Sequence, residues 1–170
     1  MILKKMNLNN MIFGSFCYLI FIFFSCSDKN SIVEYKNFNY GWESNDKAKF
    51  MIPTISGEMA NLIIHIRNNN SYAFSNIFLI ASIEVEGKLF SRDTLEYELA
   101  DSKGEWLGDG FTEVKESRLW WKEDFIIPEG EKIYAVIEHA VRSNGIENGI
   151  ENLEGIIGVG LSIKTENKNQ

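Results

Sequence analysis

The sequence predicts an all-β fold: an antiparallel two-sheet β-sandwich of about eight strands, of the jelly-roll or immunoglobulin-like kind. Apolar and polar residues alternate with a period of two along much of the chain, as expected for strands with one buried and one wetted face. Turn-forming residues interrupt these runs at short intervals, which is typical of sandwiches. An apolar segment at the N-terminus indicates an export signal ahead of the domain.

The N-terminal segment has the features of a bacterial lipoprotein signal. Two lysines precede an apolar run over residues 11–24, which is too short to span a bilayer as a stable helix. The run ends at Ser25 and Cys26, where such signals are cut and the new N-terminal cysteine is acylated. Cys17 leaves with the signal, so Cys26 has no partner for a disulfide, and acylation accounts for it. An uncleaved signal anchor is the alternative.

The chain divides into a signal peptide, a short lipidated tether, one globular domain and a polar tail. After cleavage 15 basic residues remain against 24 acidic ones, a net charge of −9. A surface of that sign repels polyphosphates, so nucleic acid is not an expected partner. The predicted boundaries of the four parts are 1–25, 26–31, 32–166 and 167–170.

The alternation places most strands directly. Gly87 permits a tight reversal between two of them. In the last strand Ile157, Val159, Leu161 and Ile163 share the apolar face, opposite Gly158, Gly160 and Ser162. Residues 88–90 begin the strand after the reversal at Gly87. The other stretches that follow the strand pattern, in chain order, are residues 62–67, 77–85, 95–99 and 157–163.

One segment fits two periods. Residues 133–141 place apolar side chains at helical spacing, but they also permit a strand with Ile133, Ala135, Ile137 and His139 on one face. Tyr, Val and Ile crowd the first half, so we predict a strand, with a short helix as the alternative. The repeated Gly-Ile-Glu-Asn at 145–148 and 149–152 is too short for a structural repeat and predicts a loop.

The residues offer little for catalysis. His65 and His139 each lie in a predicted strand among aliphatic residues, where a bond to a neighbour is the expected role. No serine occupies a Gly-x-Ser-x-Gly turn, and no His or Cys cluster has the spacing of a zinc site. The carboxylates around Gly108 and Gly110 match no established calcium loop. We therefore predict no enzyme, no cofactor and no metal; hydrolysis by paired carboxylates is a third hypothesis, since their separation cannot be read from sequence.

Aromatic residues are better candidates for a functional surface. Trp120 and Trp121 are neighbours in an expected strand, so their side chains point to opposite faces and only one enters the core. Together with Trp106 they form the predicted contact surface. Exposed aromatic side chains anchor protein partners or stack on sugar rings. A surface carbohydrate-binding module on a β-sandwich is therefore the alternative function.

Residues 99–110 form a distinctive block, Leu-Ala-Asp-x-x-Gly-x-Trp-x-Gly-x-Gly. With the signal ending at Cys26 and the other segments in their order, the chain resembles the GldH family of gliding motility lipoproteins of the Bacteroidetes over nearly its whole length. It departs from the family pattern at Val141, where Met is expected, and at the repeated Gly-Ile-Glu-Asn. The other segments that carry the resemblance are residues 66–68, 72–79, 93–95, 134–142 and 157–161.

The resemblance implies a non-enzymatic envelope component, attached through a lipid on Cys26 and located in the periplasm or at the outer membrane. It implies cooperation with other gliding-motility lipoproteins and with envelope proteins of the gliding and type IX secretion apparatus. The family offers no catalytic residue to carry over. Some Bacteroidetes attach O-linked glycans at Asp-Ser/Thr before an aliphatic residue, and Asp93-Thr94-Leu95 predicts such a glycan on Thr94.

Overall fold

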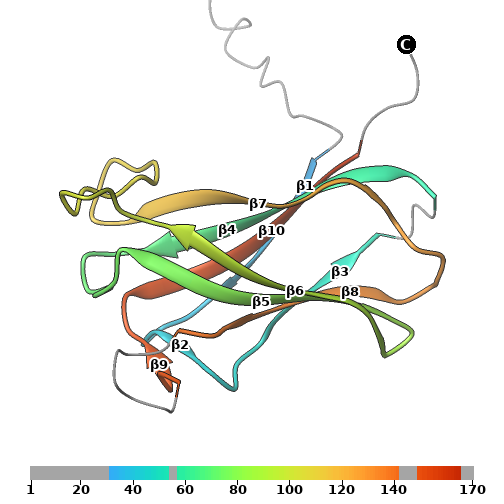
Figure 1. Cartoon of the computed structure of the whole chain (residues 1–170), viewed down its shortest axis with the longest axis horizontal. Helices are drawn as coiled ribbons and strands as arrows, with labels where there is room; N and C mark the ends of the chain where they lie inside the picture. Colours follow the sequence, from blue (N-terminus) through green and yellow to red (C-terminus); the bar gives the residue numbers. More distant parts are fainter. Residues whose placement is uncertain (1–30, 54–56, 142–148, 166–170) are drawn as a thin grey trace, which may run out of the picture.

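The computed structural model describes residues 31–53, 57–141 and 149–165, and these form an antiparallel sandwich without a helix (Figure 1). Eight strands have five residues or more, and β2 and β9 have two each, which agrees with the expected number. No helix in this part of the chain is long and apolar enough to cross a membrane. The strands are β1 (Ser31–Asn37), β2 (Trp42–Glu43), β3 (Ala48–Ile52), β4 (Met59–Asn68), β5 (Asn76–Val85), β6 (Lys88–Glu98), β7 (Lys115–Ile126), β8 (Ile133–His139), β9 (Asn152–Leu153) and β10 (Ile156–Thr165).

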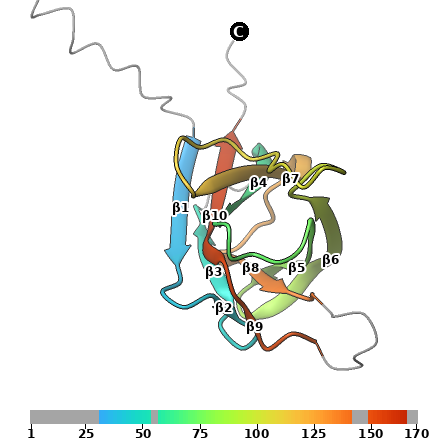
Figure 2. The ribbon, with the colours of Figure 1, turned by 90° about the vertical axis from the view of Figure 1, so that its left-hand side faces the viewer.

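The strands form two four-stranded sheets and one small ribbon. The first sheet has the order β1-β10-β4-β7, the second has the order β3-β8-β5-β6, and β2 pairs with β9. Every pairing is antiparallel. The two sheets enclose one interior (Figure 2). The predicted fold class is confirmed.

The core is the layer between the sheets, and it is built from the alternation seen in the sequence. Every second residue of β5 from Ile77 to Ile83 is fully buried, and β8 contributes Ile133, Ala135 and Ile137 from the same face. The segment that begins at Ile133, which also fitted helical spacing, is therefore a strand, as predicted. Residues 88–90, which were expected to begin a strand, and the alternating residues from Leu95 to Glu98 belong to the single strand β6.

One prediction about the core was wrong at the start of β10. Ile156, not Ile157, is buried in the core, because the register shifts between Ile156 and Gly158 where β10 pairs with β4. Ile157 is the extra residue of a β-bulge, and such a bulge exchanges the two faces of a strand. The face predicted from Val159 to Ile163 is confirmed.

All long strands run between the same two ends of the sandwich, which we call proximal and distal. The proximal end holds the start of β1, the end of β10, the β5–β6 hairpin and the β7–β8 connection. The distal end, at the left of Figure 1, holds the β4–β5 and β6–β7 connections and the β2–β9 ribbon. The chain therefore enters the domain at Ser31, at the proximal end. Residues 1–30, with the predicted signal and Cys26, lie outside the described residues.

The proximal hairpin between β5 and β6 is as tight as predicted. Val85 pairs with Lys88, so only Glu86 and Gly87 form the turn. Both have positive φ, 50° and 75°, which is the conformation of a type I′ turn. Glycine adopts this conformation without strain, and its position here sets the register of the hairpin.

Candidate contact surface

The β6–β7 connection, residues 99–114, is a structured loop at the distal end, and we call it the distal loop. Its first turn is held by Asp101, whose Oδ1 accepts the backbone N–H groups of Lys103 at 2.8 Å and Glu105 at 2.9 Å. The N–H of Gly104 donates to the carbonyl of Asp101 at 3.0 Å, and its φ of 82° requires glycine. The Asp-x-x-Gly spacing of the block therefore encodes one turn.

The other two glycines of the block let the loop fold back on β7. Asp109 and Glu116 exchange two backbone hydrogen bonds of 2.9 and 2.8 Å. A Cβ atom on Gly108 would lie 2.9 Å from the carbonyl oxygen of Glu116, and one on Gly110 would lie 2.2 Å from that of Val114. Larger residues would push the loop off the sheet, so its path depends on these glycines.

Trp106 fixes the distal loop to the neighbouring β4–β5 connection. Its indole Nε1 donates to Oδ1 of Asn70 at 3.1 Å, and its ring packs against Tyr72 with centroids 6.4 Å apart. The side chain is half-buried and its one donor is used. Trp106 was predicted as part of a contact surface; in the structure its side chain holds the distal loop against the β4–β5 connection.

The loop exposes apolar side chains that the sequence analysis did not single out. Phe111 is fully exposed, Leu107 is 56% exposed, and Val114 lies nearby at the end of the loop. A hollow of about 270 Å³ lies beside Leu107, and Glu98, Asp109 and Arg118 are among its lining residues. The available signal was two large apolar residues inside a stretch otherwise rich in glycine and carboxylates.

The adjacent tryptophans of β7 point to opposite faces, as expected. Trp121 lies in the core, and its Nε1 donates to Oδ2 of Asp93 at 2.9 Å. Trp120 is 51% exposed on the outer face of the first sheet. The structure therefore does not bring the three predicted tryptophans together on one surface. Trp121 is unavailable to a partner, and Trp106 and Trp120 lie in different elements.

Thr94, the predicted glycosylation site, is exposed on β6. The preceding Asp93 turns inward, where Lys122 Nζ lies 2.9 Å from its Oδ2. Burial alone would raise the pKa of Asp93, but the hydrogen bonds from Lys122 and Trp121 outweigh it and hold that pKa below its usual value. Glycosylation of Thr94 stays a prediction.

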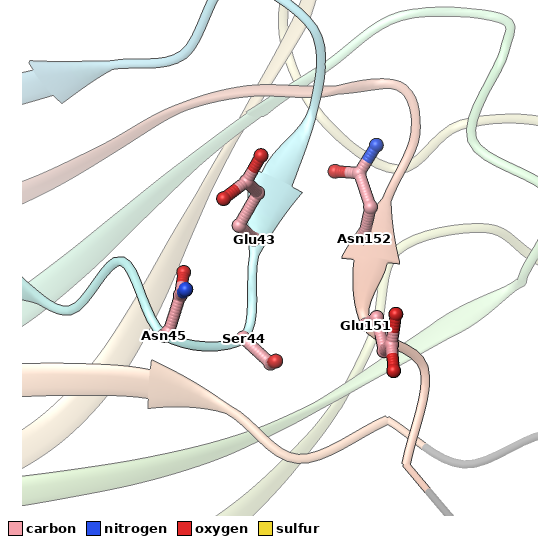
Figure 3. A pocket seen from close by; sticks show the side chains of 5 residues that line it. All are labelled: Glu43, Ser44, Asn45, Glu151 and Asn152. Carbon is pink, nitrogen blue, oxygen red and sulfur yellow. The ribbon is translucent and has the colours of Figure 1, made fainter.

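A polar hollow of about 460 Å³ lies where β2 meets β9. Figure 3 shows the side chains that line it. Its walls are carboxylate, hydroxyl and amide side chains, and no aromatic ring is among the five lining residues drawn there. Trp42, which begins β2, is fully buried. Sugar rings are held by stacking on aromatic faces, so this hollow does not favour the carbohydrate-binding alternative. The lining residues are Glu43, Ser44, Asn45, Glu151 and Asn152.

The outer face of the first sheet carries a polar network that joins all four of its strands. Glu116 of β7 is its centre: Oε2 accepts from Arg67 Nε at 2.7 Å, and Oε1 accepts from the Tyr35 hydroxyl at 2.9 Å. His65 Nδ1 lies 3.0 Å from the same Oε1, and its Nε2 lies 2.9 Å from Ser162 Oγ. Arg67 also stacks on the Tyr35 ring, with Cζ 3.8 Å from the centroid.

Small residues of β10 make room for this network. A Cβ atom on Gly160 would lie 2.6 Å from the ring of Tyr35, so that ring crosses directly over the β10 backbone toward His65. Burial raises the pKa of Tyr35, and its bond to Glu116 adds to this. Burial alone would raise the pKa of Glu116, but hydrogen bonds from Arg67, His65 and Tyr35 outweigh it and lower that pKa, so the carboxylate stays charged.

Ser162, His65 and Glu116 have the hydrogen-bond order of a Ser-His-acid triad, but their setting is structural. Ser162 is 2% exposed, and it lies in mid-strand, paired with Val33 on one side and Ile63 on the other. A nucleophile needs access to substrate and backbone donors aimed at the developing oxyanion. Amides of a central strand are used in the sheet, so this position supplies neither.

The second histidine, His139, is buried at the distal end of β8. Its ring packs edge-on against Trp42, with centroids 5.2 Å apart, and burial lowers its pKa. It lies far in sequence and on a different sheet from His65. The two imidazoles therefore form no common site.

A family model for the GldH lipoprotein matches residues 30–163, which is most of the chain. The chain belongs to the GldH lipoprotein family. A gliding motility lipoprotein GldH homolog of Christiangramia forsetii is 43% identical over 151 residues, covering 88% of this chain and 92% of that protein. The gliding motility lipoprotein GldH of Flavobacterium johnsoniae is 40% identical over 144 residues, covering 84% and 89%.

Family membership confirms the resemblance read from the sequence and implies a lipid-anchored location in the cell envelope. Neither the family nor these two relatives bears the name of an enzyme. Among solved structures, dimeric latent PorU from Porphyromonas gingivalis aligns with 81% of this chain and 13% of its own, at 10% identity and a TM-score of 0.36. Likeness at that level carries no functional argument.

Proposed function

We propose that this GldH family member is a non-enzymatic, lipid-anchored component of the gliding motility and type IX secretion apparatus that works through protein contacts. Acylation of Cys26 holds it in the envelope, in the periplasm or at the outer membrane. The distal loop makes the contact. The observation that carries this proposal is the fully exposed Phe111 on a loop that hydrogen bonds and glycines hold in one shape.

The proposed attachment and the proposed contact lie at opposite ends of the sandwich. The chain enters at Ser31 at the proximal end, whereas Phe111 lies at the distal end, beyond strands such as β4. Ten residues of strand span about 33 Å at 3.3 Å per residue. A protein tethered at the first end presents the second one away from its lipid.

The composition of the distal loop indicates the chemistry of its partner. Between residues 101 and 113 the loop holds four carboxylates against one lysine, Lys103. Exposed apolar side chains surrounded by acidic groups fit an apolar pocket with a basic rim. Other gliding-motility lipoproteins and envelope proteins are the proposed partners.

The test is a pair of variants in a gliding host. Leu107→Ser with Phe111→Ser removes the apolar contact from solvent-exposed positions, so the free energy of unfolding should change by less than about 0.5 kcal/mol. We expect cell spreading to be lost while the amount of protein in the envelope is unchanged. Tyr40→Ser is the matched control, because Tyr40 is also exposed at the distal end but lies outside the loop.

Two outcomes would contradict the proposal. Normal spreading with the double variant would show that the distal loop is not the contact. Cys26→Ser should lose envelope anchoring and spreading together, so full motility from the released protein would show that the anchor is not needed.

A further inference from the structure

The proximal end carries most of the exposed apolar side chains in the described part of the chain. Six of the eleven large hydrophobic residues that are exposed lie there, each at least 46% exposed. The distal end has four and the middle of β7 has one, Trp120. The six are Ile32, Val33, Met51, Leu89, Phe90 and Ile126.

These side chains surround the proximal end instead of forming one flat patch. Met51 and Leu89 belong to one row of residues across the outer face of the second sheet, through Tyr134 and Glu84. Val33 and Ile126 lie on the first sheet, near the start of β1 and the end of β7. A partner docked on one sheet face would cover only part of this set, whereas a plane meeting the end of the sandwich reaches both sheets.

The short distance along the chain from Cys26 to β1 indicates that this plane is the membrane surface. Ser31, where β1 begins, is the fifth residue after Cys26. At 3.3–3.6 Å per residue such a segment reaches at most about 18 Å. Acyl chains on Cys26 would be buried in the bilayer. The proximal end, with its exposed apolar side chains, is then never far from the lipid headgroups.

We propose that the proximal end rests on the bilayer surface, with Leu89, Phe90 and Ile126 in contact with the headgroup region. This inference rests on the acylation of Cys26 in the proposed function, but not on the protein partner. In this arrangement the lipid anchor and the proximal end of the protein bind the membrane together, and the distal loop points away from the membrane.

The charge of the proximal end indicates which lipids it accepts. Residues 57–59, 86–88, 123–132 and 164–165 hold six carboxylates and three lysines. Glu86 is already occupied, because its carboxylate accepts the backbone N–H groups of Glu131 at 2.8 Å and Lys132 at 3.0 Å. The remaining charge does not favour an anionic surface, so the contact is apolar and suits zwitterionic lipids.

The experiment uses the full chain expressed in a bacterium that processes lipoproteins, purified in detergent and reconstituted into phosphatidylcholine vesicles with brominated acyl chains. Phe90→Trp places a new indole at the proximal end, and Phe111→Trp places one at the distal end; both positions are exposed, so both variants keep the fold. Subtracting the wild-type signal isolates each new indole. We expect bromolipids to quench at least half of the fluorescence of the proximal indole and less than a tenth of that of the distal indole.

The arms of the experiment separate the two proposals. Protein that does not float with vesicles lacks the lipid, which contradicts the anchor and removes the basis of this inference. Protein that floats while the proximal indole is quenched no more than the distal one contradicts the bilayer contact alone. Shielding of the proximal indole from acrylamide in detergent, increasing with protein concentration, would show that a second copy covers this end and would also overturn the proposal. Replacing half of the lipid by phosphatidylglycerol at low salt should reduce the quenching.

Discussion

The two ends of the sandwich are built differently. The proximal end uses short connections, such as the two-residue turn at Glu86 and Gly87, and its exposed apolar groups lie at the ends of strands on both sheets. The distal end uses a long loop, pinned by Trp106 and by three glycines, and gathers Leu107 and Phe111 on it. A broad apolar rim suits an extended surface such as a membrane, whereas a rigid projecting loop suits one protein pocket.

The largest difference between the ends should appear when a methyl group is added to one glycine of each. Gly155 has φ of 83°, and its Cβ would lie 2.1 Å from the amide nitrogen of Tyr72. Gly155→Ala should therefore cost about 3 kcal/mol, from backbone strain and a clash with backbone that cannot move aside. Gly87 has a similar φ of 75°, but no atom lies within 4 Å of its Cβ position, so Gly87→Ala should cost about 1 kcal/mol.

Urea unfolding of both alanine variants checks this ranking. Equal losses would show that strain alone decides the effect and that the packing of Gly155 against the β4–β5 connection contributes nothing.

The next effect concerns the network that holds β1 to the other strands. Glu116→Gln keeps the shape of the side chain but removes the charge that binds Arg67 and Tyr35, and it should cost about 2 kcal/mol. The variant should increase the rate of amide hydrogen exchange more in β1 than in β5, since β5 lies in the other sheet. Glu113→Gln, in the exposed part of the distal loop, is the control and should change stability by less than about 0.5 kcal/mol. Unchanged exchange in β1 would contradict a role of the network in holding this strand.

Mild acid should weaken the distal end first. Burial places the pKa of His139 below the ordinary 6.5, so the unfolded chain takes up a proton at higher pH than the folded one. Stability therefore decreases as the pH falls below about 6.5 and continues to decrease down to the folded pKa. Glu116 and Asp93 have lowered pKa values, so their contribution is lost only below the ordinary carboxyl range.

His139→Leu should remove the first of these two steps and leave the second. Unfolding midpoints in urea at pH 7.5, 6 and 5 measure it. A variant that loses stability between pH 7.5 and 5 as steeply as the wild type would assign the first step to another group.

The smallest expected effect is on the residues with triad order. Ser162→Ala removes one hydroxyl that bonds to His65, which should cost about 1 kcal/mol and leave cell spreading normal. Loss of spreading by a folded, anchored Ser162→Ala protein would revive a hydrolytic function. It would also remove the reason to regard the outer face of the first sheet as purely structural.

The sequence predicted well those features that depend on neighbouring residues. The strands around Ile77–Ile83 and Ile133–Ile137 and the turn at Gly87 follow from local alternation and backbone freedom, and all are confirmed. The buried face at the start of β10 was predicted wrongly, because the bulge at Ile157 depends on the pairing of β10 with β4. The polar network escaped prediction because Tyr35 and Glu116 are 81 residues apart and meet only through the order of four strands.

The distal loop was predicted in part. Its Asp-Gly-Trp-Gly-Gly block was recognised, and the structure shows that these residues shape the loop. Leu107 and Phe111 were not singled out, although they lie in a stretch otherwise rich in glycine and carboxylates, because apolar character alone does not distinguish an exposed residue from a buried one. Trp121 was assigned to the contact surface but lies in the core, although the pattern correctly indicated that the side chains of Trp120 and Trp121 point to opposite faces.

The direction of β1 determines how this domain would carry mechanical load. A pull between the N-terminus and the distal loop acts along β1, so β1 can leave only by sliding past β10. Such shear strains all seven residue pairs of β1 and β10 together, whereas peeling from the other end would break them in turn. Tyr35, lying across Gly160 and bonded to Glu116 of β7, three strands away in the sheet, resists that sliding. Because the chain enters at the start of β1, such a pull loads this edge strand in shear. Shear is the direction in which its pairing with β10 resists most strongly.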